Sequence, residues 1–192
     1  TYVVPEGEKA LYLDPGMAFG TGNHATTRLC VEGLIHYFQG LAVEDVSTRK
    51  IIDAGCGSGI LALSAWLLGF RDVSAFDIDA DSIHICHENA DMNGLAGTID
   101  FCEGGIETGL PAGSANLILA NILANVLIEN REYILQGLNH QSSSCLVLSG
   151  ILQQEADEVE TAYCEIAQRQ GIQYEISRKN LGQWSALTFQ IP

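Results

Sequence analysis

The 192-residue chain has few basic side chains: nine Lys and Arg stand against 24 Asp and Glu, for a formal net charge of −15 at pH 7. Binding to nucleic acid without regard to sequence needs clustered Lys and Arg that displace the counterions of the phosphates. The nine basic residues are scattered, so direct nucleic-acid binding is not expected. An acidic surface fits a basic protein partner or a small-molecule substrate, and it also fits simple solubility.

Long apolar runs are missing too, because none reaches the roughly 18 residues that a membrane-spanning helix needs. The chain does not begin with the charged and then apolar segments of a secretory leader. No membrane association is therefore expected. With 47% hydrophobic residues and no repeat or low-complexity segment, residues 1–192 are predicted to form one globular domain with a full core.

Cysteine pairing signals are absent as well. The six cysteines, at positions 30, 56, 86, 102, 145 and 164, form no C-x-x-C pair and show no zinc spacing. We interpret them as small buried apolar side chains of a protein from a reducing cytoplasm. His84 and His87 flank Cys86 at a spacing that a metal could use, but no further ligand is in view. A solvated helix face is the favoured interpretation, and no metal is expected.

What the chain does contain is a glycine-rich stretch at 51–61, with the sequence I-I-D-A-G-C-G-S-G-I-L. Two β-branched residues lead into an acid, three glycines follow at alternate positions, and an apolar helical pattern then begins. This order predicts a buried strand, a tight turn and a helix N-terminus. Glycine permits a positive φ and close approach of a ligand, and the helix start offers free N–H groups. Open α/β sheets bind ligands at the carboxyl ends of such strands.

The glycine spacing indicates the kind of ligand. The dinucleotide fingerprint is G-x-G-x-x-G, and Ile60 stands where its third glycine would be. The observed G-x-G-x-G, with Asp53 two residues before Gly55, favours the S-adenosylmethionine site of a class I methyltransferase. The alternative is a plain βα turn without a ligand. The next predicted strand, 73–77, ends in Asp77, 22 residues after Gly55. A carboxylate there can accept both ribose hydroxyls of a nucleoside.

Strand and helix patterns alternate along most of the chain. Predicted strands cover 51–53, 73–77, 98–102, 117–121, 145–149, 173–178 and 184–190. Predicted helices cover 25–38, 60–68, 79 or 81 to 93, 123–138 and 153–170; a polar loop is predicted at 39–49 and a strand end at 12–13. This alternation predicts a doubly wound parallel sheet, and the two closing strands predict an antiparallel edge. The fold class is α/β, Rossmann-like, with a seven-stranded, mostly parallel sheet and an antiparallel terminal strand.

Residues 14–27, with the sequence D-P-G-M-A-F-G-T-G-N-H-A-T-T, form a predicted loop ahead of a helix. Asp-Pro-Gly is turn chemistry, and an exposed Phe19 is unfavourable on a mere linker. We therefore favour a role for this loop in binding a carboxylate or in closing over a ligand. The alternative is a connector in which Asn23 caps the following helix.

Asn121 is the polar end of an otherwise apolar predicted strand, 117–121. A polar amide at the carboxyl end of a buried parallel strand points to the ligand crevice, and this interpretation is favoured over capping of the next helix. The loop at 103–106 is predicted to lie over the same crevice as the rim of an adenine site.

Several of these stretches together resemble one family. They are D-P-G-M-A-F-G-T-G at 14–22 with His24, Thr26 and Thr27; D-A-G-C-G-S-G-I-L at 53–61; D-I-D at 77–79; A-N-I-L at 120–123; and S-G-I-L at 149–152. The sequence resembles the catalytic domain of the ribosomal protein L-eleven methyltransferase (PrmA) family over essentially its whole length. The glycine turn and Asp77 are common to many methyltransferases, whereas D-P-G-M-A-F-G-T-G and A-N-I-L are much more specific.

The resemblance implies an S-adenosylmethionine-dependent enzyme that methylates lysine or N-terminal amines of a large-subunit ribosomal protein. Asn121 would face the reacting amine and is the predicted catalytic residue. The predicted cofactor-binding residues are Phe19, His24, Thr27, Gly55, Gly57, Asp77 and Asn121. Within this set the loop from Phe19 to His24 would close over the methionine end of the cofactor.

The chain departs from the family in two ways. The small-residue–proline pair that usually flanks the loop histidine is Asn23 and Ala25 here. The family also carries an N-terminal substrate-recognition domain, which is expected to be absent from 1–192. The chain is therefore predicted to be a catalytic domain, either as a fragment or as a stand-alone homologue with another substrate.

Three other kinds of protein share parts of this pattern. A methyltransferase acting on a small-molecule or nucleic-acid amine would use the same scaffold and the same Asn121. A nicotinamide-dependent enzyme is disfavoured by the glycine spacing and by the terminal strand pair. A non-catalytic interaction module is disfavoured because Asp77 and Asn121 are both present.

Overall fold

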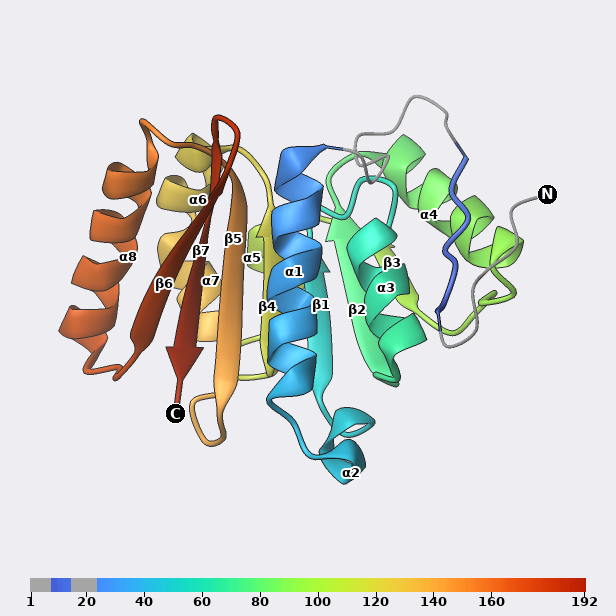
Figure 1. The fold of residues 1–192 in the computed structure, drawn as a ribbon, viewed down its shortest axis with the longest axis horizontal. Helices are drawn as coiled ribbons and strands as arrows, with labels where there is room; N and C mark the ends of the chain where they lie inside the picture. Colours follow the sequence, from blue (N-terminus) through green and yellow to red (C-terminus); the bar gives the residue numbers. More distant parts are fainter. Residues whose placement is uncertain (1–7, 15–23) are drawn as a thin grey trace.

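The computed structural model describes residues 8–14 and 24–192, and in these ranges seven strands form one sheet in the order β3-β2-β1-β4-β5-β7-β6 (Figure 1). The strands are β1 (Lys50–Ala54), β2 (Asp72–Asp77), β3 (Asp100–Glu103), β4 (Leu117–Asn121), β5 (Ser144–Leu152), β6 (Glu175–Leu181) and β7 (Trp184–Ile191). The helices are α1 (Ala25–Gln39), α2 (Val43–Val46), α3 (Ile60–Leu68), α4 (Ala80–Met92), α5 (Ile106–Gly109), α6 (Ala124–Glu129), α7 (Arg131–Gly137) and α8 (Ala156–Gln170).

Strands β1 to β5 pair in parallel, whereas β7 runs antiparallel to both of its neighbours, β5 and β6. The predicted seven-stranded sheet with an antiparallel terminal strand is confirmed. The chain order places β1 between β2 and β4, so the direction of winding reverses at β1. In open α/β sheets this reversal opens a crevice at the carboxyl ends of the strands.

The sheet is buried on both faces, since neighbouring residues along each central strand belong to different cores. Ile51, Leu117 and Val147 pack in the core beneath α1, α3 and α4, and Ile52 and Ile118 belong to the core on the opposite face. Residues on both faces of such a parallel strand must be apolar, which explains the unbroken apolar runs in the sequence.

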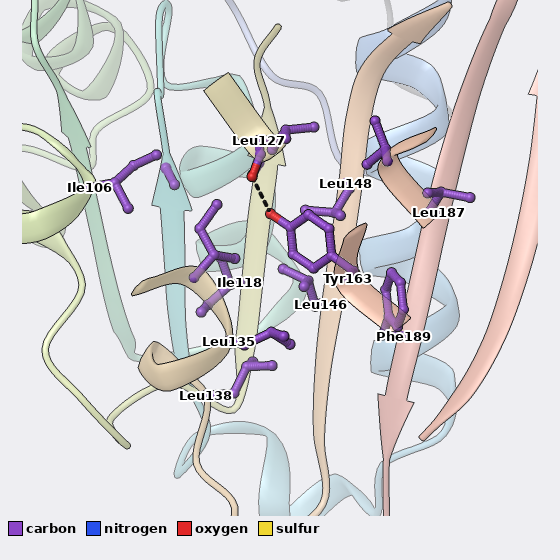
Figure 2. Close-up of a cluster of buried hydrophobic side chains, with 14 of the residues drawn as sticks. Ile106, Ile118, Leu127, Leu135, Leu138, Leu146, Leu148, Tyr163, Leu187 and Phe189 are labelled. Carbon is purple, nitrogen blue, oxygen red and sulfur yellow. Dashed lines mark hydrogen bonds between the residues drawn. The ribbon is translucent and has the colours of Figure 1, made fainter. Parts of the chain in front are cut away.

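The core on the opposite face of the sheet, which contains Ile52 and Ile118, holds a buried tyrosine hydroxyl (Figure 2). Tyr163 of α8 has no exposed surface, and its hydroxyl donates a hydrogen bond to the carbonyl of Leu127 over 3.0 Å. Its ring lies 5.7 Å from that of Phe189 on β7, measured between centroids. The partner for the hydroxyl removes most of the penalty of burying it, so α8 is held against both α6 and the sheet.

Two predicted elements are wrong. The helix predicted at 123–138 is two helices, because Asn130 leaves the helical conformation at φ −103° and its side chain bonds the carbonyl of Val126. The strand predicted to end at 12–13 is absent from the described residues 8–14. There the backbone of Tyr12 pairs with the side-chain amide of Asn93, which donates to its carbonyl and accepts from its N–H. The Asn93 amide therefore makes the two hydrogen bonds that the backbone of a neighbouring strand would make with Tyr12.

Smaller differences concern loops and thiols. The predicted polar loop at 39–49 contains the short helix α2, and the loop after β3 leads into α5. Cys30, Cys56, Cys86 and Cys145 are buried as predicted, but Cys102 is exposed and Cys164 is partly exposed. Cys102 lies on β3, which is an edge strand of the sheet. Within the described ranges, every helix is too short or too polar to cross a bilayer.

Candidate active site

A cavity of about 530 Å³ lies at the carboxyl ends of the central strands, where the winding reverses. Its wall is built from the turn after β1, the end of β2, the loop after β3, the end of β4 and the carboxyl end of β5. Most of the lining side chains are apolar. Of the described residues in the wall, only Asp77 and Asp79 carry a charge. The cavity is therefore suited to a ligand with an apolar body and few polar groups.

The glycine turn forms the floor of this cavity. Gly55, Gly57 and Gly59 all have positive φ, at 74°, 53° and 76°, which explains why glycine recurs at alternate positions. A Cβ on Gly55 would lie 2.4 Å from Cγ2 of Ile122, so this position also has no room for a side chain. The turn delivers the chain into α3, where Gly59 is the N-cap.

Asp77 is tied to the glycine turn. Its Oδ2 accepts the N–H of Gly57 over 2.9 Å, and its Oδ1 accepts the N–H of Asp79 over 3.1 Å. A carboxylate has about four acceptor positions, so both oxygens can accept further hydrogen bonds from a ligand in the cavity. The sequence prediction that Gly57 and Asp77 meet at one crevice is geometrically satisfied.

Asn121 ends β4 and lines the same cavity. Its Nδ2 lies 3.5 Å from Oγ1 of Thr27, a long contact, while its Oδ1 is buried with no partner among the described residues. A buried acceptor without a donor is unfavourable by about 1–3 kcal/mol unless a ligand satisfies it. The capping alternative is wrong, because the N-cap of α6 is Leu123 and no side chain caps that helix.

Thr26, rather than its predicted neighbour Thr27, lines the cavity. Thr27 is buried behind it, next to Asn121. Ser149 on β5 donates its hydroxyl to the Thr26 carbonyl over 3.0 Å and so fixes the start of α1 at the cavity. Thr27 is thus placed to orient Asn121, and its assignment as a cofactor contact stays a prediction.

Two predicted loop residues have different outcomes. Phe19 lies outside the described residues, as does the alternative cap Asn23. His24 is the N-cap of α1, and its Nδ1 lies 2.8 Å from Oγ1 of Thr26. Its ring packs edge-on against that of Trp184, with centroids 5.0 Å apart. His24 therefore buttresses the cavity wall, without itself lining the cavity.

Trp184 and Gly150 also line the cavity, although neither is among the predicted site residues. Trp184 begins β7, far along the chain from every predicted site residue, and only the β5–β7 pairing brings it to the cavity. Gly150 sits at a register shift in β5 with φ 83°, and a Cβ there would lie 2.4 Å from the carbonyl oxygen of Ile122. Gly150 belongs to the S-G-I-L motif, which could have indicated that it lies at the site. No local sequence pattern indicated this for Trp184.

The predicted adenine rim lies where expected, since Gly104, Gly105 and Ile106 line the cavity. Across from them Ile78, four-fifths exposed, projects from the end of β2, and Leu123, two-thirds exposed, projects after β4. Apolar side chains left open at the mouth of a cavity are typical of contact with a flat or apolar ligand group.

Asp53 lies directly beneath the turn and has no exposed surface. Its Oδ2 accepts the N–H of Ala62 over 3.1 Å, and its Oδ1 has no partner among the described residues. Burial, partly offset by the Ala62 hydrogen bond and reinforced by the charge of Asp77, raises the pKa of Asp53 to about 7. This acid braces the start of α3 against β1.

No cluster that could hold a metal ion occurs within 8–14 and 24–192. His84 pairs with Glu88 over 3.3 Å on the exposed face of α4, and the ring of His87 packs edge-on against Phe101. A larger cavity, about 1030 Å³, lies near the amino end of β5. None of the six described residues that were predicted for the site lines it.

The sheet order, the positive-φ glycine turn and the carboxylate that ends β2 define the class I methyltransferase fold. A ribosomal protein L11 methylase from Lactobacillus delbrueckii subsp. bulgaricus has a similar structure, with a TM-score of 0.83 and 29% identity, covering 100% of this chain and 90% of that one. An RNA methyltransferase from Salinibacter ruber, solved with S-adenosyl-L-homocysteine, has a TM-score of 0.58 at 17% identity over 84% of this chain and 90% of its own. At that identity the likeness shows the fold alone.

The chain belongs to the family described as Ribosomal protein L11 methyltransferase (PrmA), since the profile of that family matches residues 2–191. A relative with the family's name from Pelobacter propionicus is 38% identical over 180 residues, 94% of this chain and 55% of the relative. One from Streptococcus agalactiae is 34% identical over 189 residues, 98% of this chain and 55% of the relative. The chain thus spans about half the length of the curated relatives that it matches, and the resemblance noted in its sequence is confirmed.

Proposed function

We propose that this chain is the catalytic domain of an S-adenosylmethionine-dependent protein N-methyltransferase that modifies lysine or N-terminal amines of a large-subunit ribosomal protein. The observation that carries the proposal is that Asn121, whose Oδ1 has no partner among the described residues, lines the same cavity as Gly57 and Asp77, which are joined by a hydrogen bond. The Asn121 amide is suited to binding an amine, and the Asp77 carboxylate is suited to binding a nucleoside. Membership of the family supports the same reaction and the same class of acceptor.

The residues present fit the cofactor. Asp77 retains acceptor positions for two ribose hydroxyls, and the positive-φ backbone of Gly55 and Gly57 lines the cavity. Gly104, Gly105 and Ile78 offer a flat apolar slot for the adenine. When bound, S-adenosylmethionine supplies a methyl group that is already activated by its sulfonium.

The chain must present the acceptor amine with a free lone pair. For a lysine with a pKa of roughly 10.4, deprotonation at pH 7 is unfavourable by about 4–5 kcal/mol, and for an α-amine near pKa 8 by about 1 kcal/mol. No base lies at the Asn121 side of the wall among the described residues, since the charged groups are Asp77 and Asp79. We infer that Asn121 Oδ1 accepts an N–H of the amine and aligns its lone pair, while apolar Ile122, Leu123 and Trp184 favour the uncharged amine.

The net charge of −15 supports a basic protein as acceptor in preference to nucleic acid or an anionic membrane surface. The four buried free thiols fit a reducing cytoplasm. The alternative is a class I methyltransferase acting on another amine. The match covers about half of the length of the curated relatives, so the choice of acceptor rests on family membership alone.

Two measurements test the proposal. Calorimetric titration with S-adenosylhomocysteine is expected to show micromolar binding, and NADH run in parallel is expected to show none. Transfer of a labelled methyl group from S-adenosylmethionine to purified large-subunit ribosomal proteins is then followed, with rRNA and small amines as parallel acceptors. Labelling of RNA or of a small amine alone would favour the alternative, and binding of NADH alone would overturn the methyltransferase assignment.

A further inference from the structure

Two buried thiols are in contact beneath the cavity. Cys56 lies in the glycine turn between Gly55 and Gly57, and Cys86 lies on α4. Their Sγ atoms are 3.5 Å apart, and the two residues are 5% and 0% exposed. All six cysteines fall within the described residues, and this pair forms the one thiol–thiol contact found among them. The proposed methyl-transfer chemistry uses neither thiol.

The pair is closely integrated with the turn. Cys86 Sγ also donates to the carbonyl oxygen of Gly57 over 3.2 Å. A Cβ on Gly59 would lie 3.0 Å from the same sulfur, so Cys86 packs directly against the turn backbone. The hydrogen bond with Cys86, burial, and the charge of nearby Asp53 raise the pKa of Cys56, which keeps its thiol protonated at neutral pH.

We propose that Cys56 and Cys86 form a reversible oxidation site whose disulfide pulls the glycine turn toward α4 and weakens cofactor binding. A peroxide oxidises one thiol to a sulfenic acid with release of water. The second thiol then attacks that sulfur, a second water leaves, and the disulfide forms. Together the two thiols lose two electrons and two protons, and a dithiol reductant reverses the change by exchange.

The geometry explains why the turn would move. A disulfide needs an S–S distance of about 2.05 Å, so the two sulfurs must approach by roughly 1.5 Å from their 3.5 Å contact. Cys86 sits within a 13-residue helix, whereas Cys56 is flanked by two glycines that tolerate a change in φ and ψ. Most of the displacement therefore falls on the turn.

The displaced turn carries the groups on which the proposed cofactor site depends. The N–H groups of Gly55 and Cys56 both donate to the Phe76 carbonyl, over 2.9 and 3.0 Å, and Gly57 donates to Asp77 over 2.9 Å. A shift of about 1 Å lengthens such bonds beyond the usual 2.7–3.2 Å range. This second half of the inference rests on the proposed function, whereas disulfide formation itself does not.

The test begins with the reduced chain, treated with hydrogen peroxide and then with N-ethylmaleimide. Peptide mapping by mass spectrometry under non-reducing conditions is expected to show a Cys56–Cys86 linked peptide. S-adenosylhomocysteine affinity, measured by calorimetry, is expected to fall at least tenfold after oxidation and to recover with dithiothreitol. Because Cys56 is protonated and buried, we expect linkage to be slower than oxidation of exposed Cys102 at neutral pH.

Two variants separate this site from general oxidation. Cys86→Ser keeps a hydroxyl that can bond the Gly57 carbonyl and is expected to show the same affinity before and after peroxide. Cys102→Ser is expected to lose affinity on oxidation as the unmodified chain does. The inference is overturned if no Cys56–Cys86 peptide forms, or if Cys86→Ser responds to peroxide as strongly as the unmodified chain.

Hydrogen–deuterium exchange of residues 54–60 distinguishes a failure of this inference from a failure of the proposed function. If the reduced chain does not bind S-adenosylhomocysteine, the proposed function falls, and the exchange of this peptide decides whether the disulfide moves the turn. Exchange that increases on oxidation and reverts on reduction supports the switch. Unchanged exchange in a chain shown to carry the disulfide overturns it.

Discussion

Gly57 donates its backbone N–H to Oδ2 of Asp77 over 2.9 Å, although the two residues are 20 positions apart in the chain. The bond joins the turn after β1 to the end of β2, so each helps to set the position of the other. The glycine supplies the conformation, with φ 53°, and the carboxylate fixes it. A ligand at this crevice therefore meets a backbone and an acid that are already arranged.

Asp77→Ala is expected to weaken S-adenosylhomocysteine binding at least tenfold, or about 1.4 kcal/mol, because both the proposed ribose acceptor and the anchor of Gly57 are lost. Calorimetry measures the change. Asp72→Ala serves as the control, since Asp72 begins the same strand at its opposite end and pairs with Lys50 across exposed surface. Equal affinities for the two variants would contradict the role of Asp77.

Asn121→Ala is expected to leave S-adenosylhomocysteine affinity within a few-fold of the original and to lower turnover by about 100-fold or more, because the amine loses its alignment. Labelled methyl transfer measures turnover and calorimetry measures binding. Asn139→Ala is the control, since Asn139 is half-buried, accepts the Gln141 N–H and does not line the cavity. A large loss of affinity with normal turnover would show that Asn121 contacts only the cofactor.

Gly150→Ala is expected to destabilise the fold by about 3 kcal/mol or more, because a left-handed backbone carrying a Cβ meets the Ile122 carbonyl at 2.4 Å. Gly94→Ala has a similar φ, 70°, but its Cβ would meet nothing within 4 Å, so only about 1 kcal/mol is expected. Urea unfolding measures both free energies. A similar loss for the two variants would mean that the contact with Ile122 is readily relieved.

Asp53→Asn is expected to change how stability depends on pH. Burial raises the pKa of Asp53 to about 7, above its unfolded value of 3.8, so the folded chain holds this proton more tightly than the unfolded chain. The stabilisation from this group is complete below about pH 4 and is lost as pH rises through 7. Between these pH values the free energy of unfolding falls by at most about 1.4 kcal/mol per pH unit because of this group. An Asn side chain does not titrate and contributes no such pH dependence.

The measurement is the difference in unfolding free energy between Asp53→Asn and the original chain from pH 5 to 8. We expect that difference to grow in favour of the variant up to about pH 7 and then to level off. Asp72→Asn, at an exposed position, serves as the control. A flat profile for Asp53→Asn would show that the carboxylate is ionised throughout this range.

Asn89→Leu is expected to lower the free energy of unfolding by about 2–5 kcal/mol, because two backbone groups lose a buried partner. Asn89 has no exposed surface; its Oδ1 accepts the N–H of Asp14, and its Nδ2 donates to the Ser58 carbonyl, each over 2.9 Å. It thus links the segment 8–14 to the glycine turn. Chemical denaturation measures the loss, and a change of under 1 kcal/mol would show that water replaces both bonds.

The sequence by itself determined the elements whose physical causes are local. Alternate glycines required positive φ, the apolar runs required strands buried on both faces, and the lack of a helix between the last two strands required an antiparallel edge. Asp77 and Asn121 were placed at the carboxyl ends of β2 and β4 for the same reason. In a parallel sheet, the carboxyl ends of the strands lie along the same edge, independently of the loops that connect them.

Tertiary structure alone decided what depends on distant partners. Trp184 reaches the cavity only because β7 pairs with β5, and Cys56 meets Cys86 only because α4 packs over the turn. Asn93 replaces the expected strand at 12–13 by bonding Tyr12 from 81 residues away. No local propensity encodes these contacts, because each depends on where two separate segments come to lie when the sheet closes.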